Sequence, residues 1–138
     1  MVYKIRDLSK RFGKYYALKD IDLDINENEK IVIIGPSGSG KSTLLRCLNT
    51  LEIPSNGKIL FHDMKLDEQS YKNIHGKIGM VFQDFRLLDK SVYDNVAFAL
   101  EITGATKRQI RRKVPDALSR VGLSSKAKNY PNELSGGE

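Results

Sequence analysis

A chain of 138 residues with 40% apolar and 29% charged residues is long enough for one compact domain and too short for two ordinary ones. Its formal net charge of +6 points to an anionic partner, and charge alone does not decide among a nucleotide, a membrane surface and nucleic acid. The opening stretch MVYKIRDLSK alternates apolar and charged residues, so we expect neither a signal peptide nor a membrane span there. Cys47 is the only cysteine, which excludes an internal disulfide and favours the cytoplasm.

Alternating apolar and polar residues predict strands in the first part of the chain. Residues 2–5 (VYKI) and residues 18–25 (LKDIDLDI) show the period of two that is typical of half-exposed antiparallel strands. Residues 31–34 (IVII) are apolar on both faces, which predicts a strand buried in a parallel sheet. Residues 58–61 (KILF) and residues 77–82 (KIGMVF) are two further predicted strands.

Three stretches have the apolar spacing of helices. Residues 41–52 carry leucines at helical intervals, and residues 91–102 begin with a serine suited to cap a helix. Residues 106–123 place apolar residues on one side of a third predicted helix, whose end is marked by Gly122. Pro115 lies inside this last stretch and predicts a kink or a break.

The glycine-rich stretch GPSGSGKST, residues 35–43, fits the pattern G-x-x-x-x-G-K-[ST], and we call it the phosphate loop. It follows the predicted buried strand and precedes the first predicted helix, which is the context that this motif requires. Its glycines let backbone N–H groups turn inward and form a nest for phosphate at the positive end of a helix. The predicted nucleotide-binding residues of the loop are Gly35, Pro36, Ser37, Gly38, Ser39, Gly40, Lys41, Ser42 and Thr43.

The last three of these residues have separate predicted roles. Lys41 supplies a positive charge to the β- and γ-phosphates, and Ser42 coordinates Mg²⁺ through its hydroxyl group. Thr43 is placed to reach the α-phosphate. The phosphate loop therefore predicts binding of a nucleotide with Mg²⁺, while leaving kinases, GTPases, helicases and transport ATPases open.

Three further segments narrow this choice. Residues 11–25 (RFGKYYALKDIDLDI), residues 81–88 (VFQDFRLL) and residues 134–138 (LSGGE) occur in this order around the phosphate loop. Together they resemble the ATPase subunit of an ATP-binding cassette (ABC) system. The resemblance spans nearly the whole chain, and it implies ATP and Mg²⁺ as ligands.

The resemblance also implies roles for two residues outside the phosphate loop. Phe12 matches the aromatic residue that stacks on adenine, although Tyr15 or Tyr16 could substitute and Phe12 could instead belong to the core. Gln83 matches the glutamine whose amide reaches the metal and the attacking water. The resemblance therefore makes Lys41 and Gln83 the catalytic candidates, and Ser42 and Gln83 the metal candidates.

Residues 134–138 resemble the signature of the family, and we call them the signature segment. The last position is usually Gln in the family and is Glu138 here. By resemblance, Ser135, Gly136 and Gly137 contact the γ-phosphate held by the other subunit of a head-to-tail homodimer.

The family needs a metal-binding Asp, a general-base Glu and a switch His after its signature. We therefore expect these groups to lie beyond residue 138, and we expect the chain to be a truncated part of a longer ATPase. His62 and Asp63 end a short apolar run, but we interpret them as turn residues rather than as this missing site.

The expected fold is α/β: a P-loop NTPase of the ABC ATPase type that is incomplete at its C-terminus. The resemblance implies an antiparallel β subdomain at residues 1–30 and 57–75, and a partial RecA-like nucleotide-binding core at residues 31–56 and 76–83. Residues 84–138 would form a helical subdomain that ends in the signature segment and docks a membrane partner.

Within the family, residues 78–138 are most similar to the cell-division ATPases, and residues 41–59 to those of polar amino acid uptake. We therefore expect a peripheral protein on the inner face of the cell membrane that drives an integral membrane partner, with cell division favoured over uptake. The basic run at residues 107–113 is interpreted as a solvated helix face, with contact to anionic lipid as the alternative. The rival classes are a non-catalytic nucleotide-binding module and a nucleic-acid-associated protein, and we expect no specific nucleic acid.

Overall fold

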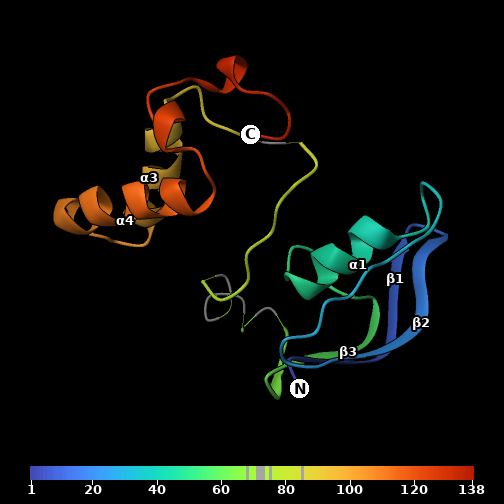
Figure 1. Cartoon of the computed structure of the whole chain (residues 1–138). Coiled ribbons are helices and arrows are strands. Elements are labelled where there is room, and N and C mark those ends of the chain that lie inside the picture. Colours follow the sequence, from blue (N-terminus) through green and yellow to red (C-terminus); the bar gives the residue numbers. More distant parts are fainter. Residues whose placement is uncertain (68, 71–73, 75, 85) are drawn as a thin grey trace. The chain divides into compact units, whose positions relative to one another are not determined.

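The computed structural model describes residues 1–67, 69–70, 74, 76–84 and 86–138. The chain forms two compact units, residues 1–80 and residues 81–138. Figure 1 colours the ribbon by residue number, from blue at the N-terminus to red at the C-terminus. Among the described residues, no helix is long and apolar enough to cross a membrane. The finer division into two subdomains and a core, which the resemblance implies, stays a prediction.

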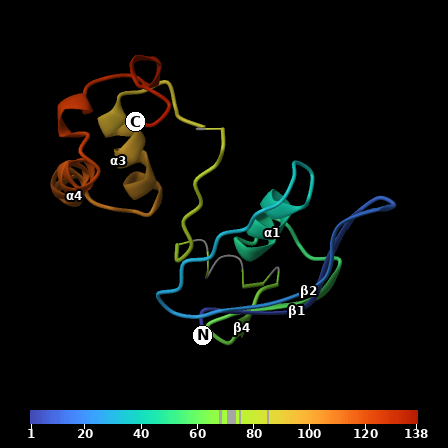
Figure 2. The same cartoon turned by 45° about the vertical axis from the view of Figure 1, so that its right-hand side comes forward.

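The first unit contains a four-stranded antiparallel sheet. Its strands are β1 (Tyr3–Phe12), β2 (Tyr15–Ile25), β3 (Asn56–Phe61) and β4 (Met64–Lys65), in the order β2-β1-β3-β4 (Figures 1 and 2). The predicted antiparallel strands are thus confirmed, and β1 and β2 extend further toward their shared hairpin than the alternation alone indicates. His62 and Asp63 form the turn between β3 and β4 with φ values of 45° and 63°, as expected.

A bulge in β1 sets which side chains reach the core. Asp7 has a φ of 51°, and the strand register shifts between Ile5 and Leu8. The carboxylate of Asp22 accepts a hydrogen bond from the Asp7 N–H group at 2.8 Å, which satisfies a donor that the bulge removes from the ladder. As a result, Ile5 and Leu8 are both fully buried although three positions separate them.

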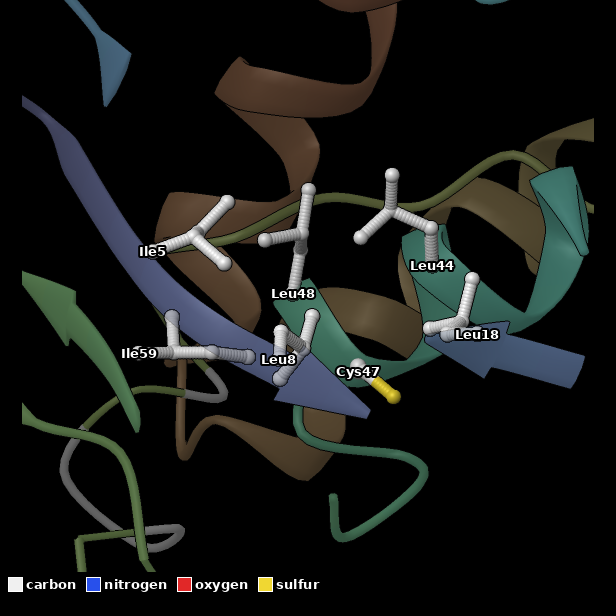
Figure 3. Close-up of a cluster of buried hydrophobic side chains, with 7 residues drawn as sticks. All are labelled: Ile5, Leu8, Leu18, Leu44, Cys47, Leu48 and Ile59. Carbon is white, nitrogen blue, oxygen red and sulfur yellow. The ribbon is translucent and has the colours of Figure 1, made fainter. Parts of the chain in front are cut away.

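Helix α1 (Lys41–Leu48) packs on this sheet. Its side chains Leu44, Cys47 and Leu48 meet residues of β1, β2 and β3, as Figure 3 shows. The seven buried residues of this core are Ile5, Leu8, Leu18, Leu44, Cys47, Leu48 and Ile59. The packing holds the first turn of α1, and with it the end of the phosphate loop, against the sheet.

Helix α1 is shorter than predicted because a C-terminal cap ends it before residue 52. The N–H groups of Thr50 and Leu51 donate to the carbonyl groups of Cys47 and Arg46, at 3.2 and 2.8 Å. This is the Schellman pattern, which needs a residue with positive φ at the position of Thr50. Thr50 has a φ of 56° there, a conformation usually reserved for glycine.

Two predicted strands are wrong. Residues 31–34 are not in a strand, and Val32 and Ile34 are 80% and 90% exposed. Residues 77–82 are not in a strand either, and Val81 is 96% exposed. A strand that is apolar on both faces forms only where neighbouring strands and covering layers bury it. Among the described residues, no strand pairs with either segment.

The second unit is helical. Its elements are α3 (Val92–Ile102), α4 (Lys107–Arg120) and two short 3₁₀ helices, η1 (Ser124–Lys126) and η2 (Pro131–Glu133). Ser91 caps α3 as predicted, by accepting a hydrogen bond from the Asp94 N–H group at 3.1 Å. The buried residues of its core come from both long helices and are Val92, Ala97, Ile110, Val114 and Leu118.

Of the kink or break expected at Pro115, the break is wrong, because α4 runs unbroken from Lys107 to Arg120, and the kink stays a prediction. A proline inside a helix costs about 3 kcal/mol, so other contacts must offset it. Val114, the residue before the proline, is fully buried in the helical core. Both ends of the helix are also fixed, by a capping box at Thr106 and by Gly122, whose φ of 74° ends the helix where the sequence predicts.

Candidate nucleotide-binding site

The phosphate loop turns sharply into α1. Gly38 and Gly40 have φ values of 80° and 89°, in the left-handed region that favours glycine. The Ser39 N–H group donates to the Pro36 carbonyl at 3.3 Å, which closes a turn within the loop. Gly40 is the N-cap residue of α1, so the loop ends where unpaired N–H groups and the positive end of the helix dipole meet.

Gly40 also fixes the loop to the sheet. A β-carbon at this position would lie 2.2 Å from the carbonyl oxygen of Ala17 and 3.0 Å from the Cδ2 atom of Leu18. Only a glycine therefore fits between the loop and β2. This contact explains the glycine at position 40 by close approach as well as by its backbone conformation.

Lys41 folds back over its own loop. Its Nζ atom donates hydrogen bonds to the carbonyl oxygens of Gly35 at 2.8 Å and Pro36 at 2.7 Å, and it lies 3.4 Å from the Ser39 hydroxyl. The ammonium group is thus held at the mouth of the loop, beside the helix N-terminus. The first turn of α1 contains no acidic residue, so nothing there neutralises this positive end. The arrangement attracts a phosphate group.

The remaining loop residues are accessible to a ligand. Ser42 is exposed and Thr43 is half-buried, both in the first turn of α1. Mg²⁺ takes few protein ligands and usually binds through one or two side-chain oxygens together with phosphate oxygens and water. The hydroxyl group of Ser42 fits such a role. The described residues contain no cluster of three His, Cys, Asp or Glu residues that could hold a metal without a nucleotide.

Gln83 and the signature segment lie in the second unit, whereas the phosphate loop lies in the first. Gln83 is exposed, and Ser135, Gly136 and Gly137 are exposed as well. The structure therefore brings together the residues of the phosphate loop, and the roles of Gln83 and the signature segment stay predictions.

Phe12 lies at the end of β1, where it pairs with Tyr15 across the hairpin. It is 47% exposed, and Tyr15 and Tyr16 are 63% and 48% exposed. All three rings can therefore meet a planar ligand, and the alternative that Phe12 belongs to the core is wrong because it is not buried. Ala17, which contacts Gly40, lies next to Tyr16, so this hairpin and the phosphate loop are directly connected.

Lys10 is a residue near this site that the sequence does not single out. Its Nζ atom lies 4.9 Å from the centre of the Phe12 ring, 2.8 Å from a carboxylate oxygen of Glu52 and 2.8 Å from the Ile53 carbonyl oxygen. It therefore ties the strand that carries Phe12 to the segment after α1. The contact joins residues more than forty positions apart, so periodicity along the chain could not reveal it.

The signature segment is organised around its last residue. The Ser135 N–H and hydroxyl groups both donate to the Oε2 atom of Glu138, at 2.9 and 2.8 Å. The Glu138 N–H group donates back to the Ser135 carbonyl at 3.0 Å. The hydrogen bond from the Ser135 N–H group to the Glu138 side chain is one half of a capping box. The other half differs, because the Glu138 N–H group bonds to the Ser135 carbonyl group and not to its hydroxyl group.

An open hollow of about 750 Å³ lies in the first unit, lined by residues outside the phosphate loop. Its lining includes Ser9, Arg11, Tyr16, Lys19 and Asp20. The Ser9 hydroxyl accepts a hydrogen bond from the Asp20 N–H group at 2.9 Å. Two basic side chains here make the hollow the natural rival of the phosphate loop for an anionic ligand.

Comparisons with known proteins show the family of this chain. The family model described as ABC transporter matches residues 18–138. The cell division ATP-binding protein FtsE of Mycobacterium tuberculosis is 52% identical over 126 residues, which cover 88% of this chain and 55% of that protein. The arginine transport ATP-binding protein ArtM of Bacillus subtilis is 44% identical over 139 residues, covering 98% of this chain and 58% of that protein. The methionine import ATP-binding protein MetN of Clostridioides difficile is 43% identical, covering 97% and 43%.

Solved structures show the same fold. The dimeric bacterial ABC transporter cassette MJ0796 aligns with a TM-score of 0.84 at 34% identity, over 98% of this chain and 64% of that one. The protein cbiO1 from Clostridium perfringens, part of the ABC transporter complex cbiONQ, aligns with a TM-score of 0.87 at 33% identity, over 99% and 56%. The chain spans about half the length of the curated relatives that it matches. The cassette fold predicted from the sequence is confirmed, and the chain belongs to the ABC transporter family of ATP-binding proteins.

Proposed function

We propose that this chain binds MgATP through the phosphate loop and that the protein to which it belongs uses ATP to drive a membrane partner. The observation that carries the proposal is the position of Lys41, whose ammonium group bridges the Gly35 and Pro36 carbonyl groups at the N-terminus of α1. A cation and free N–H groups converge there, which is the recognised chemistry of phosphate binding. The structure of the cassette MJ0796 bound to ADP and Pi, in a relative of the same fold, adds support.

The chain's own residues divide the proposed work among them. The N–H groups of the loop hold the phosphates, and Lys41 offsets negative charge that builds up on the transferring phosphoryl group. Phe12 would stack on adenine, with Tyr15 and Tyr16 as neighbouring rings. Gln83 would orient the attacking water. Bound Mg²⁺, held by Ser42 and Gln83, would neutralise further phosphate charge.

Assembly with other subunits is also a proposal. The cassette MJ0796 was solved as a dimer, and the curated relatives include import and transport ATP-binding proteins. We infer a head-to-tail homodimer in which Ser135, Gly136 and Gly137 of one copy face the ATP of the other. We also infer attachment to an integral membrane partner at the inner face of the cell membrane.

We propose a cell-division role of the FtsE type, with an FtsX-like partner, and a role in polar amino acid uptake as the alternative. The 52% identity to FtsE over 126 residues supports the first. The 44% identity to ArtM over 139 residues supports the second. A pull-down with the two kinds of membrane partner, followed by mass spectrometry, would separate them: retention of a permease but not of an FtsX-like protein would contradict the first.

Nucleotide binding can be tested directly on this chain. A fluorescent ATP analogue should bind the wild-type protein in the presence of Mg²⁺, and Lys41→Ala should weaken its binding by about 10-fold or more, since a charge-assisted hydrogen bond is lost. Lys58→Ala is the matched control, because it removes the same charge from an exposed position in β3. Equal affinity of wild-type and Lys41→Ala protein would contradict the proposal.

A further inference from the structure

The signature segment departs from the family pattern at one position, and that position makes the closest contacts in the segment. Glu138 accepts both the N–H group and the hydroxyl group of Ser135 on a single carboxylate oxygen. A carboxylate accepts hydrogen bonds and donates none. Both hydrogen-bond donors of Ser135, its N–H and its hydroxyl group, are therefore already used inside the segment.

The groups around Glu138 favour the ionised form of its carboxyl group. Its hydrogen bonds with the Ser135 N–H and hydroxyl groups lower the pKa of the Glu138 carboxyl group, and the ammonium group of Lys126 lowers it further. The Lys126 Nζ atom lies 3.5 Å from the Oε1 atom of Glu138. A carboxyl group with a depressed pKa is ionised at neutral pH, so the segment carries a full negative charge beside Ser135.

A phosphate group would need the same Ser135 donors that Glu138 already occupies. Phosphate oxygens accept hydrogen bonds, and the Ser135 hydroxyl has one proton to donate. An incoming phosphate must therefore displace the carboxylate from Ser135 and tolerate a like charge a few ångströms away. Glutamine at the same position would have nearly the same shape and one acceptor oxygen, and it would carry no charge.

We infer that Glu138 competes with phosphate for the Ser135 hydroxyl and N–H groups and thereby sets how tightly the signature segment binds an anion. The inference rests on the proposed function, in which this segment meets the phosphate of a second copy. Glu138 acts through Ser135 and is a positioning residue. Its expected effect is weaker closure of the ATP-bound dimer than a glutamine at the same position would give.

Sulfate is a suitable probe, because it is tetrahedral and stays doubly charged down to about pH 3. The ¹⁵N-labelled chain would be titrated with sodium sulfate at constant ionic strength, and the amide signals of Ser135, Gly136 and Gly137 would report binding. We expect Glu138→Gln to bind sulfate about 10-fold more tightly than the wild type at pH 7, since one like charge at close range is removed.

The matched control is Glu133→Gln. Glu133 caps η2 by accepting a hydrogen bond from the Tyr130 N–H group at 2.6 Å, and it lies five positions from Glu138. The control removes the same charge from the same unit without touching Ser135. It should leave the sulfate affinity within about twofold of the wild type, because an exposed charge farther away is screened.

The pH profile separates competition from a merely structural role. In the wild type, sulfate affinity should rise as the pH falls through the depressed pKa of Glu138, below its ordinary value of 4.5. In Glu138→Gln the rise should be smaller, because only the other carboxyl groups of the chain still titrate in that range. Equal sulfate affinity of the two proteins at pH 7, or no response of these three amides in either, would overturn the inference.

Failure of this inference can be distinguished from failure of the proposed function. Failure of the Lys41→Ala titration would remove nucleotide binding at the phosphate loop and leave the sulfate result unaffected. Success of that titration with equal sulfate affinities would keep nucleotide binding and remove the role of Glu138.

Discussion

The backbone of Gly40 lies against the carbonyl group of Ala17 so closely that a β-carbon on residue 40 would lie 2.2 Å from the carbonyl oxygen. Through this contact the sheet determines where the phosphate loop ends and where α1 begins. The loop is therefore a part of the first unit's packing as well as a ligand-binding segment.

Gly40→Ala should consequently damage both the fold and the site. The new methyl group clashes with backbone rather than with a side chain that can move, and residue 40 must also keep its φ of 89°. We expect a loss of several kcal/mol in the free energy of unfolding, measured by urea denaturation. Gly13→Ala is the control: its φ is +59°, but no atom lies within 4 Å of the added carbon, so it should cost only about 1 kcal/mol. Similar losses in both variants would show that the contact with Ala17 is unimportant.

The core between α1 and the sheet predicts a difference between two leucines of one helix. Leu48 is 8% exposed and packs in the core, whereas Leu45 is 46% exposed. Leu48→Ala should lower the free energy of unfolding by about 2–5 kcal/mol, because it leaves a cavity among closely packed side chains. Leu45→Ala should change it by less than about 1 kcal/mol. A thermal melt of the two variants would compare them, and equal shifts of Tm would mean that α1 does not pack as described.

Thr50 predicts a stabilising substitution. It has a φ of 56°, it is 4% exposed, and its hydroxyl oxygen has no hydrogen-bond partner among the described residues. Thr50→Gly should relieve both costs and raise the free energy of unfolding by about 1 kcal/mol. Thr103→Gly is the opposite case, because the Thr103 hydroxyl donates to the Leu100 carbonyl at 2.9 Å and its φ is −89°. It should destabilise the protein, and a loss of stability in Thr50→Gly would show that the threonine side chain contributes more than its strain costs.

Cys47 predicts a dependence on alkaline pH. The side chain is 1% exposed, and burial raises the pKa of its thiol to about 11 from an ordinary 9.0. A raised pKa means that the folded state holds the proton more tightly than the unfolded state. The stability that this thiol contributes is therefore fully present below pH 9 and is lost as the pH rises toward 11. Because Cys47 is the only cysteine, the rate of alkylation by iodoacetamide reports on this group alone. Alkylation at pH 8 should be slow in the native protein and fast in urea; fast native alkylation would contradict the burial of the thiol.

The sequence predicts local structure well where a local cause exists. The turn residues His62 and Asp63, the cap Ser91 and the helix end at Gly122 each follow from the properties of a few neighbouring residues. The phosphate loop follows in the same way from its glycines and Lys41. These features need no partner from elsewhere in the chain.

The predictions that fail depend on distant partners. Residues 31–34 have the composition of a buried strand, but composition cannot supply the neighbouring strands that burial requires, and the segment lies exposed. Two features that the sequence does not predict at all depend on distant partners as well. The bulge at Asp7 depends on Asp22 across the sheet, and the contact of Lys10 with Glu52 depends on how α1 packs on the sheet. At Pro115 the helix continues without the expected break, beside the fully buried Val114.

The most direct test of nucleotide binding at the phosphate loop is to locate bound ATP on the labelled protein by amide chemical shifts in the presence of Mg²⁺. We predict the largest changes at residues 35–43 and their loss in Lys41→Ala. Largest changes at Ser9, Lys19 and Asn56, which line the hollow, with residues 35–43 unchanged, would contradict this prediction and move the nucleotide site to the hollow.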